Sequence, residues 1–462
     1  MGKRNIFLYG APGSGKTTLG ESLAEALNRT AIDTDALVAE LEGRSIPEIF
    51  AAAGEAGFRA AERRALREAL KRTPDGGVVS LGGGTLLDEE NRRLCEESGL
   101  VVCLEAPSRE ELARRLQSAP GSRPLGDRSE SRAGHYASFP CRLAAFFTLQ
   151  DSLVLVGSGI AAMDGFAERV VADSEVARCW SGRFGEPVAI IPSGEVNKTP
   201  QTVCGLWSSF ARCGTGRKNR VTAFGGGVTG DLTGFAAATW MRGIDWINVP
   251  TTLLSMVDAS TGGKTGCDLP EGKNLAGAFH PPRLVVADTD FLKTLPEREL
   301  RSGRAEMIKH EIIADLPRVE RPYGIPSASE IARSLGVKVE IVRSDPFERT
   351  GRRMLLNCGH TVGHAIEKAA GYGAISHGEA VAIGCVEEAR LAVGLGLAEK
   401  GWPEELAARF ADAGLPVELP AGMSFDLLVP DMRGDKKRDG DKVVFALPCG
   451  WGDVRKVEVD LR

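Results

Sequence analysis

The chain has 462 residues, of which 43% are hydrophobic and 26% charged. At roughly 100–200 residues per domain, this length predicts about three domains, each with its own core. The 57 basic and 62 acidic side chains give a formal net charge of -5, which argues against a nucleic acid or an anionic membrane as partner. The 10 cysteines form no CxxC pair, so we expect reduced thiols in a cytoplasmic protein. No apolar run approaches the ~20 residues of a membrane span.

The expected elements fall into three regions. Up to residue 150, short apolar runs alternate with charged helical stretches, which is typical of a parallel sheet. Here we expect strands over 6–9, 77–81 and 100–104 and helices over 17–27 and 59–70. The region 151–290 alternates again, with expected strands at 153–156, 169–172, 188–191, 221–224, 246–249 and 284–287. In the third region, 291–462, helical stretches such as 378–393 and 404–413 dominate. The sequence therefore predicts an α/β fold with domains 1–150, 151–290 and 291–462.

A phosphate-binding loop comes directly after the first expected strand. Gly10-Ala11-Pro12-Gly13-Ser14-Gly15-Lys16-Thr17 fits GxxxxGK[ST], with a strand before it and a helix after it. In such a loop, backbone N–H groups surround phosphate oxygens, the lysine reaches the β- and γ-phosphates, and the threonine hydroxyl holds Mg²⁺. We expect an ATP site made of Gly13, Ser14, Gly15, Lys16, Thr17 and Thr18.

Several polar residues in the first region are candidates for the acceptor site. Asp33 and Asp35 stand where a second strand should end, and two carboxylates there can assist Mg²⁺ and orient an attacking hydroxyl. Arg59, Arg123 and Arg142 are candidate anion clamps, because a guanidinium matches carboxylates and phosphates. Taken singly, each of these residues is more typical of a turn or a solvated surface.

The order of these motifs resembles shikimate kinase over most of residues 3–147. The matching motifs are the phosphate loop, Asp33-Thr34-Asp35, Phe58-Arg59 with Glu62, Leu81-Gly82-Gly83-Gly84, Arg123-Pro124-Leu125 and Arg142. The resemblance implies that Asp35, Arg59, Gly82, Gly83 and Arg142 hold shikimate and that Arg123 belongs to a closing lid. It also implies Thr17 and Asp33 at Mg²⁺, and Lys16, Asp35 and Arg123 as catalytic residues. Two features depart from that family: Leu143-Ala144-Ala145-Phe146 replaces Ala-Pro-Leu-Tyr, and the terminal strand and helix are truncated or absorbed into the second region.

A second glycine loop, Gly225–Asp231, satisfies GxGxxG between an expected strand and an expected helix. Alone, this fingerprint is a weak indication of a dinucleotide site. Small residues, hydroxyls and lysines are concentrated further along the chain, at Thr251-Thr252, Asp258–Gly266 and Gly272–Asn274. A pocket for phosphate and carboxylate groups needs such a set.

Histidines suggest a metal site. His360 and His364 are spaced i, i+4, so one helix face can present both to a cation. Glu306 lies in another helical stretch, and His377 precedes Gly378. Spacing alone pairs His360 with His364 and leaves the third ligand open, although a catalytic zinc usually has three protein ligands.

Together, these motifs resemble 3-dehydroquinate synthase over about residues 180–450. The resemblance implies cyclisation of a seven-carbon keto sugar acid phosphate (DAHP) to 3-dehydroquinate, with loss of phosphate and recycling of NAD. It assigns Zn²⁺ or Co²⁺ to Glu306, His360 and His377, in place of the His360/His364 pairing, and Lys264, Lys309 and His364 to catalysis. It places NAD on Asp173, Glu195, Lys198, Gly227, Val228, Thr229, Gly230, Asp231, Thr251, Thr252, Lys264, Lys273, Phe291, Leu292, Lys293 and Thr294. It places substrate on Asp258, Arg242, Asn274, Lys338, Arg353, Asn357 and one of Lys436 and Lys437.

The two resemblances imply a bifunctional enzyme of the shikimate pathway. We expect a P-loop kinase-type sheet domain, a Rossmann-like NAD-binding domain and a mainly helical metal-binding domain. The expected ligands are shikimate, ATP with Mg²⁺, and DAHP, and we expect a cytoplasmic homodimer formed through the synthase part.

Two alternatives stay open. One is another small P-loop kinase fused to a related sugar-phosphate cyclase or a metal alcohol dehydrogenase. Arg59, Arg142 and the turn at 82–84 favour shikimate over a nucleoside monophosphate as the kinase substrate. The other makes the kinase part an ATP-sensing or structural module, against which the intact Lys16 and Asp33 count.

Overall fold

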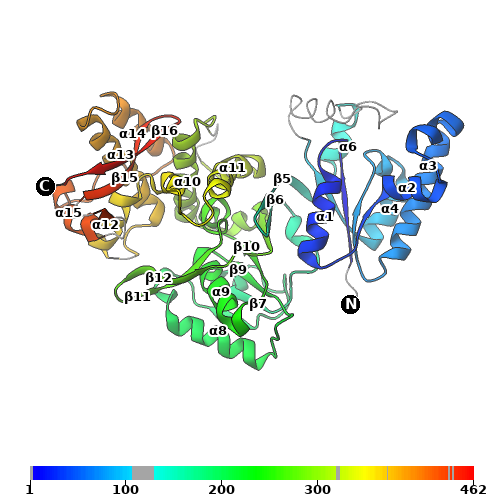
Figure 1. Ribbon diagram of the computed structural model, residues 1–462, viewed down its shortest axis with the longest axis horizontal. Helices are drawn as coiled ribbons and strands as arrows, with labels where there is room; N and C mark the ends of the chain where they lie inside the picture. Colours follow the sequence, from blue (N-terminus) through cyan, green and yellow to red (C-terminus); the bar gives the residue numbers. More distant parts are fainter. Residues whose placement is uncertain are drawn as a thin grey trace. The chain divides into compact units, whose positions relative to one another are not determined.

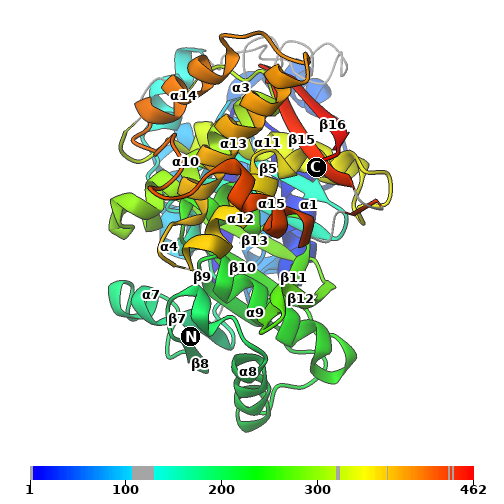
Figure 2. The ribbon, with the colours of Figure 1, turned by 90° about the vertical axis from the view of Figure 1, so that its left-hand side faces the viewer.

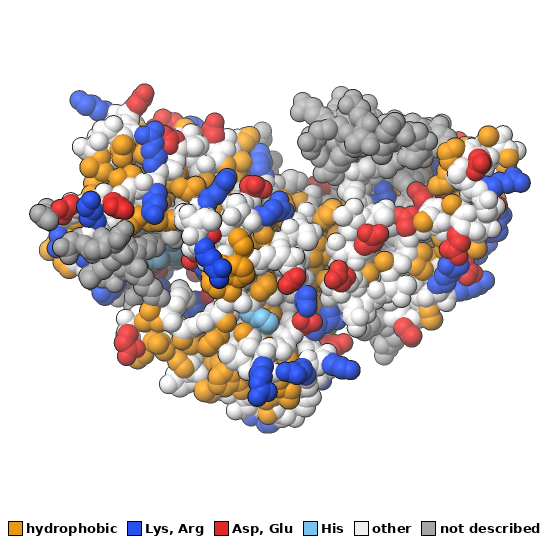
Figure 3. Space-filling model, in the orientation of Figure 1, with side chains coloured by type: hydrophobic (Ala, Val, Ile, Leu, Met, Phe, Trp, Pro, Cys, Tyr) orange, Lys and Arg blue, Asp and Glu red, His pale blue; other side chains and the backbone are white. Residues whose placement is uncertain are grey.

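The chain forms two compact units. In the computed structural model, the described residues are 4–106, 130–318, 323–371, 373–434, 438–439 and 442–461. Unit 1 comprises Met1–Phe146 with Ser152–Glu168, and unit 2 comprises Phe147–Asp151 with Arg169–Arg462 (Figure 1). None of the described helices combines the length and apolar character that crossing a membrane requires. Basic and acidic side chains are interspersed over the face in Figure 3, in keeping with the small net charge.

Unit 1 contains the strand order β2-β3-β1-β4-β5-β6. The strands are β1 (Asn5–Gly10), β2 (Ala31–Asp33), β3 (Val78–Ser80), β4 (Gly99–Leu104), β5 (Arg142–Leu149) and β6 (Ser152–Ser158). Pairing from β2 through β5 is parallel. The helices are α1 (Lys16–Leu27), α2 (Thr34–Glu42), α3 (Ile46–Arg72), α4 (Glu89–Ser98) and α6 (Ala133–Ala137), with short turns η1 (Thr85–Leu87), η2 (Glu130–Arg132) and η3 (Ile160–Ala162).

Helices cover both faces of the sheet, so strand β1 is fully buried. A strand that is buried on both faces needs a continuous apolar run, and β1 has one. Phe7 and Tyr9 share a core with α2 and α3, whereas Leu8 points to the other face. There it lies against α1, since a Cβ on Gly20 would meet its Cδ1 at 3.6 Å. The carboxyl ends of β1, β2 and β3 thus lie at one edge of a parallel sheet, the usual place for a site.

The expected boundary at residue 150 falls between β5 and β6, but Ser152–Glu168 clusters with unit 1. Two arginines hold this segment there. Arg29 Nη2 donates to Asp164 O at 2.7 Å, and the backbone N–H of Arg4 donates to Asp164 Oδ2 at 3.1 Å. Strand β2 ends at Asp33, where a second strand was expected, whereas β5 was not expected. Strand β5 pairs with β4 and takes the fifth position, with no helix between Arg142 and Leu149.

The first half of unit 2 is a parallel sheet with the strand order β13-β10-β9-β7-β8. These strands are β7 (Val170–Asp173), β8 (Ala189–Ile191), β9 (Val221–Gly225), β10 (Trp246–Pro250) and β13 (Leu284–Asp288), each at an expected position. The other elements are α7 (Ser174–Cys179), η4 (Glu195–Asn197), α8 (Pro200–Arg212), α9 (Gly227–Thr239), η5 (Trp240–Arg242), η6 (Ser255–Ala259), β11 (Lys264–Leu269), β12 (Gly272–Phe279) and η7 (Thr289–Thr294). Figure 2 shows α9 between α8 and the antiparallel β11–β12 hairpin. The glycine- and lysine-rich sequence of that hairpin lacks strand alternation, so it was not expected.

The second half of unit 2 is mainly helical, as expected, but it ends in a small sheet. Its helices are α10 (Glu297–Ala314), α11 (Ala328–Ser344), η8 (Arg352–Asn357), α12 (His360–Ala370), α13 (His377–Gly394), α14 (Trp402–Asp412) and α15 (Phe425–Gly434). The strands are β14 (Arg438–Asp439), β15 (Lys442–Gly450) and β16 (Asp453–Val459). Strand β15 packs on α13 and contributes Phe445, Ala446 and Leu447 to two buried clusters. Sequence reasoning missed this hairpin.

Candidate active sites

A cavity of about 590 Å³ lies at the carboxyl edge of the sheet in unit 1. The loops after β1, β2 and β3 all contribute to it. The sequence-predicted residues in its lining are Gly13, Gly15, Lys16, Thr17, Thr18, Asp33, Asp35, Arg59, Gly82 and Gly83. The structure therefore brings the phosphate loop and most of the expected acceptor residues to one cavity.

The loop between β1 and α1 encloses the ammonium group of Lys16. Its Nζ donates hydrogen bonds of 2.9 Å to the carbonyls of Gly10 and Ala11. Gly13 and Gly15 have φ values of 81° and 93°, a left-handed conformation that glycine adopts without steric cost. Because α1 begins at Lys16, the free N–H groups of a helix N-terminus lie at the loop, an arrangement that favours phosphate.

Asp33 connects the loop to the second strand. Its Oδ2 accepts a hydrogen bond of 2.7 Å from Thr17 Oγ1, and its Oδ1 accepts from the backbone N–H groups of Asp35 and Ala36 at 2.9 and 3.2 Å. Mg²⁺ prefers oxygen ligands, so the hydroxyl of Thr17 and the carboxylate of Asp33 fit this ion. Asp33 thus caps the N-terminus of α2, and Asp35, in the first turn of this helix, lines the cavity.

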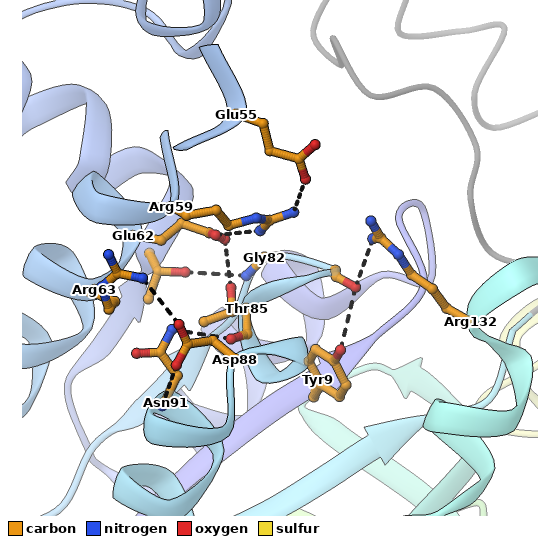
Figure 4. Close-up of polar contacts among 12 residues, drawn as sticks. Tyr9, Glu55, Arg59, Glu62, Arg63, Gly82, Thr85, Asp88, Asn91 and Arg132 are labelled. Carbon is orange, nitrogen blue, oxygen red and sulfur yellow. Dashed lines mark hydrogen bonds and ion pairs between the residues drawn. The ribbon is translucent and has the colours of Figure 1, made fainter. Parts of the chain in front are cut away.

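Arg59 lies on the acceptor side of the cavity, between two carboxylates (Figure 4). It forms ion pairs with Glu62 and, at 3.3 Å, with Glu55. Burial lowers the pKa of Arg59, but the two carboxylates outweigh burial and raise it. Glu62 is 1% exposed, and its Oε1 accepts from Thr85 Oγ1 at 2.8 Å. A Cβ on Gly82 would lie 2.8 Å from the same oxygen, so a side chain at this position would disturb the network.

In unit 2, three helices bring Glu306, His360 and His377 together. They lie on α10, α12 and α13, and one potential ligand atom of each lies within 4.8 Å of the others. His360 Nε2 and His377 Nε2 are 3.5 and 3.4 Å from Glu306 Oε1. Tetrahedral zinc with bonds of about 2.0–2.1 Å separates its ligand atoms by about 3.3–3.4 Å. These separations fit a single divalent cation.

The protonation of Glu306 and His360 suits a cation. At His377, burial lowers the pKa, but Glu306 and Glu367 outweigh burial and raise it to about 10. Glu306 is fully buried, and neither carboxylate oxygen receives a hydrogen bond of regular geometry from the described residues. Burial raises its pKa, but Lys309, His377 and His360 together outweigh burial, so the pKa lies well below the usual value. Burial and Lys309 lower the pKa of His360, which keeps its imidazole neutral. Its Nδ1 lies 3.0 Å from Cys358 O, so Nε2 is left for the metal.

Cationic side chains surround this cluster. Lys309 is buried and pairs with Glu306. Lys338 Nζ donates to Asp258 O and Oδ1 at 2.6 and 2.7 Å, and these contacts outweigh burial and lower the pKa of Asp258. Arg353 is 3% exposed and donates to Gly262 O at 3.2 Å. Asp258 lies in η6, a π-helical turn of the kind that often marks functional sites.

The glycine loop of unit 2 leads directly into α9. Lys198 is buried beside it, with Nζ 2.6 Å from Asp231 Oδ2 and 2.7 Å from Asn274 Oδ1. Burial lowers the pKa of Lys198, but Asp231 and Glu195 outweigh burial and raise it to about 12. The hydroxyls of Thr229 and Thr251 are buried without a hydrogen-bond partner in the described part of the chain. A helix N-terminus with polar groups around it suits the pyrophosphate of a dinucleotide.

Comparisons with known proteins agree with both sites. Residues 188–302 match the family model 3-dehydroquinate synthase N-terminal, and residues 303–438 match 3-dehydroquinate synthase C-terminal. The 3-dehydroquinate synthase of Xanthomonas axonopodis pv. citri (strain 306) is 48% identical over 285 residues, which cover 58% of this chain and 76% of that protein.

The chain belongs to the 3-dehydroquinate synthase family. Residues 12–149 match the family model for shikimate kinase, so a shikimate kinase domain precedes the synthase domains. The chain therefore combines two activities of the shikimate pathway.

Two solved structures are similar to the synthase part of the chain. A 2-deoxy-scyllo-inosose synthase complexed with carbaglucose-6-phosphate, NAD⁺ and Co²⁺ is 26% identical and covers 68% of this chain and 97% of its own, with a TM-score of 0.60. A 2-epi-5-epi-valiolone synthase from Streptomyces hygroscopicus subsp. jinggangensis 5008, with NAD⁺ and Zn²⁺ bound, is 28% identical and covers 69% and 94%, also with a TM-score of 0.60.

Several further residues expected for the synthase site have defined positions in unit 2. The His364 ring is 5.4 Å from that of His360, beside the metal cluster. Lys264 pairs with Glu348 at 2.5 Å, and Asp173 caps α7. Phe291, Leu292, Lys293 and Thr294 form η7, Lys273 pairs with Glu367, and Asn357 ends η8. Arg123, Lys436 and Lys437 lie outside the described residues.

Two expected substrate residues are not among the groups described above. Arg142 is not among the residues that line the cavity of unit 1; it begins β5 and pairs with Glu105 at 2.8 Å. Arg242 lies beyond the C-terminal end of α9. The 13 residues of α9 span about 20 Å, so this helix separates Arg242 from the glycine loop of the same chain.

The structure also shows site residues that sequence reasoning missed. Arg132 and Phe146 line the cavity of unit 1; no motif pointed to Arg132. In unit 2, Glu367 Oε2 lies 3.5 Å from His377 Nδ1, and its Oε1 lies 3.2 Å from Lys273 Nζ. Burial raises the pKa of Glu367, but His377 and Lys273 outweigh burial and lower it to about 2. Its position seven residues after His360, two turns along one helix face, is a signal that could have identified it.

Proposed function

We propose that unit 1 phosphorylates shikimate from ATP, and that unit 2 converts DAHP to 3-dehydroquinate with release of phosphate, each at its own site. The observation that carries this proposal is that each unit brings its own cluster of reactive groups together. The phosphate loop and the acceptor residues line one cavity of unit 1, and the Glu306, His360 and His377 cluster lies within unit 2.

For the kinase reaction, one group of residues binds ATP with Mg²⁺ and another group binds the acceptor. When ATP binds, the ammonium group of Lys16 exchanges its hydrogen bonds to the loop carbonyls for contacts with the β- and γ-phosphates. Its positive charge there stabilises the phosphoryl group during transfer. Thr17 and Asp33 would hold Mg²⁺. Asp35 lies in the same cavity and orients the shikimate hydroxyl for attack on the γ-phosphorus, and Arg59 binds the substrate carboxylate.

For the synthase reaction, Glu306, His360 and His377 would hold Zn²⁺ or Co²⁺, and the loop before α9 would hold NAD. When bound, the metal supplies polarisation of a substrate hydroxyl and NAD supplies a reversible hydride acceptor. The chain itself binds the two anionic groups of DAHP through cations, and the positions of Lys338 beside Asp258 and of buried Arg353 support this role. His364, beside the metal cluster, moves a proton during ring opening and closure.

A cytoplasmic homodimer, formed through the synthase part, belongs to the same proposal. Leu275 and Phe279 are 40% and 45% exposed on one face of β12, and the Phe347 ring lies 5.7 Å from that of Phe279. A second copy of the chain would bury this apolar surface, which sedimentation of the purified protein can detect.

A paired assay of the purified full-length chain tests the two activities. One arm supplies DAHP with NAD and Zn²⁺ and measures phosphate release; the other supplies shikimate with ATP and Mg²⁺. Lys16→Ala should reduce shikimate phosphorylation by roughly 10²–10³-fold, the scale for loss of one transition-state charge contact, and should leave phosphate release from DAHP unchanged. Loss of both activities in this variant would show that the sites depend on each other. An inactive kinase arm in the wild-type chain would favour the ATP-sensing alternative.

A further inference from the structure

We infer that Arg132, and not Arg142, supplies the second guanidinium that binds the substrate carboxylate at the kinase site, opposite Arg59. This inference rests on the kinase function proposed for unit 1 and specifies how its substrate is recognised. Arg132 ends η2, directly before α6, in a stretch where the sequence showed no motif.

Arg59 and Arg132 approach the same backbone loop from different elements (Figure 4). A Cβ on Gly84 would lie 2.9 Å from Arg59 Nη2 and 3.1 Å from Arg132 Nη1. The two nitrogens are therefore no more than about 6 Å apart, so one carboxylate can contact both, because each charged N–H···O contact takes about 2.8 Å. Both side chains also line the cavity that contains Asp35 and the phosphate loop.

Beside the Gly82–Gly84 loop, a substrate carboxylate needs a cation in addition to Arg59. Glu62 and Glu55 both pair with Arg59, so its charge is already compensated. Arg132 has no carboxylate partner among the described residues, and its Nη1 donates to Gly83 O at 3.3 Å. That carbonyl also accepts a hydrogen bond of 2.7 Å from Tyr136 Oη, so the loop is held without Arg132. The remaining N–H groups of Arg132 are suited to an anion.

Arg142 is engaged elsewhere. It begins β5, where it pairs in register with Cys103 of β4. Its guanidinium forms an ion pair of 2.8 Å with Glu105, and its side chain is 44% exposed. Moving it into the cavity would break this pair, whereas Arg132 is already in the lining.

The experiment compares Arg132→Gln with the matched control Arg142→Gln in the full-length chain. Glutamine keeps a donor for Gly83 O but removes the charge. We expect Arg132→Gln to raise the KM for shikimate roughly 10- to 100-fold, the scale of a hydrogen bond to a charged group, and to leave the KM for ATP within about 3-fold. Arg142→Gln should change neither KM by more than about 3-fold. The neutral methyl ester of shikimate should show the same KM with the wild-type chain and with Arg132→Gln, because it lacks the negative charge.

Three results would overturn the assignment. The first is a larger rise in the KM for shikimate with Arg142→Gln than with Arg132→Gln. The second is a rise in the KM for the methyl ester with Arg132→Gln that equals the rise for shikimate, and the third is a rise in the KM for ATP together with that for shikimate. Either of the last two would mean that Arg132 only supports the loop. Phosphate release from DAHP by the same preparations reports whether the chain is folded. If the wild-type chain shows no shikimate-dependent turnover, the kinase function is refuted. The Kd for shikimate, measured by calorimetry, then replaces KM in the comparison of the two variants.

Discussion

At the scale of single residues, the buried charges of unit 2 have fixed partners. Lys338 is 6% exposed and is held by Asp258, and Lys198 is 5% exposed and is held by Asp231. A buried charge without a partner would cost several kcal/mol, so these pairs allow buried cations both beside the metal cluster and beside the glycine loop. Such a local set explains how a chain of net charge -5 can bind a substrate with two anionic groups.

Asp345 shows how one buried carboxylate supports this site. Its oxygens accept hydrogen bonds from the backbone N–H groups of Arg349, Thr350 and Arg353 at 2.8, 3.1 and 3.2 Å. Burial raises its pKa, but these donors outweigh burial and lower it to about 2 from the usual 3.8. The carboxylate therefore fixes the loop that carries Arg353.

For Asp345→Asn, we expect a Tm lower by a few degrees at pH 7 and a higher KM for DAHP. Because the folded state holds the carboxyl pKa below its unfolded value, the stabilisation is complete above about pH 4 and disappears as the pH falls toward 2. Calorimetric scans of both proteins from pH 7 to pH 3 should therefore show a difference in Tm that narrows below pH 4. A difference that stays constant across this range would contradict the role of the charge.

At the scale of elements, the metal cluster depends on close packing of α12 against α13. A Cβ on Gly384 would lie 2.1 Å from the carbonyl oxygen of Gly359, so the two helices approach each other at glycine. Glu388 of α13 accepts hydrogen bonds from the backbone N–H groups of Gly359 and Val362 at 2.7 and 3.3 Å. This carboxylate caps α12 at the turn that contains His360, where the helix dipole favours a negative charge.

Replacing Glu388 by alanine should loosen this turn. Two buried N–H groups lose their acceptor, which costs about 1–3 kcal/mol each, and misplacement of His360 should weaken Zn²⁺ binding roughly 10-fold or more, as for other residues that orient a metal ligand. Competition with a chromogenic chelator measures this affinity. Glu387→Ala is the matched control, because Glu387 pairs with Arg390 on its own helix. Equal Zn²⁺ affinity of the two variants would exclude the positioning role of Glu388.

At the scale of the whole molecule, each unit encloses its own core and its own site. The kinase core gathers Phe7, Tyr9, Phe58 and Val79, and the metal-bearing helices pack in separate clusters of unit 2. No group described for one site belongs to the other unit. Each proposed reaction therefore depends on its own ion, Mg²⁺ in unit 1 and Zn²⁺ or Co²⁺ in unit 2.

Removal of metal should therefore separate the two activities. After treatment with a chelator and addition of Mg²⁺ alone, we expect full shikimate phosphorylation and no phosphate release from DAHP. Addition of Zn²⁺ or Co²⁺ should restore the synthase reaction. Phosphate release that persists after complete removal of zinc and cobalt would contradict the assignment of Glu306, His360 and His377.

Groups that are contiguous in sequence were predictable from sequence. The phosphate loop, the pair Asp33 and Asp35, and the glycine loop before α9 each depend on a strand–turn–helix unit, whose geometry is set by neighbouring residues. The parallel strands of both units were also predictable, because burial on two faces demands continuous apolar runs. The β15–β16 hairpin was missed because the third region was interpreted as mainly helical, and no strand was assigned to it.

Groups that converge from distant elements were decided by tertiary structure. The i, i+4 spacing favoured His364 as the partner of His360, whereas the cluster that lies around Glu306 joins His360 to His377 of the next helix. Likewise, Arg142 matches the expected motif order, but pairing of β5 with β4 directs it to Glu105 and leaves Arg132 at the cavity. The amino-acid sequence alone thus determined which chemical groups the chain carries and which local turns bind phosphate. Which side chains meet across helices and strands depended on packing, since contacts between residues far apart in the chain have no local signal.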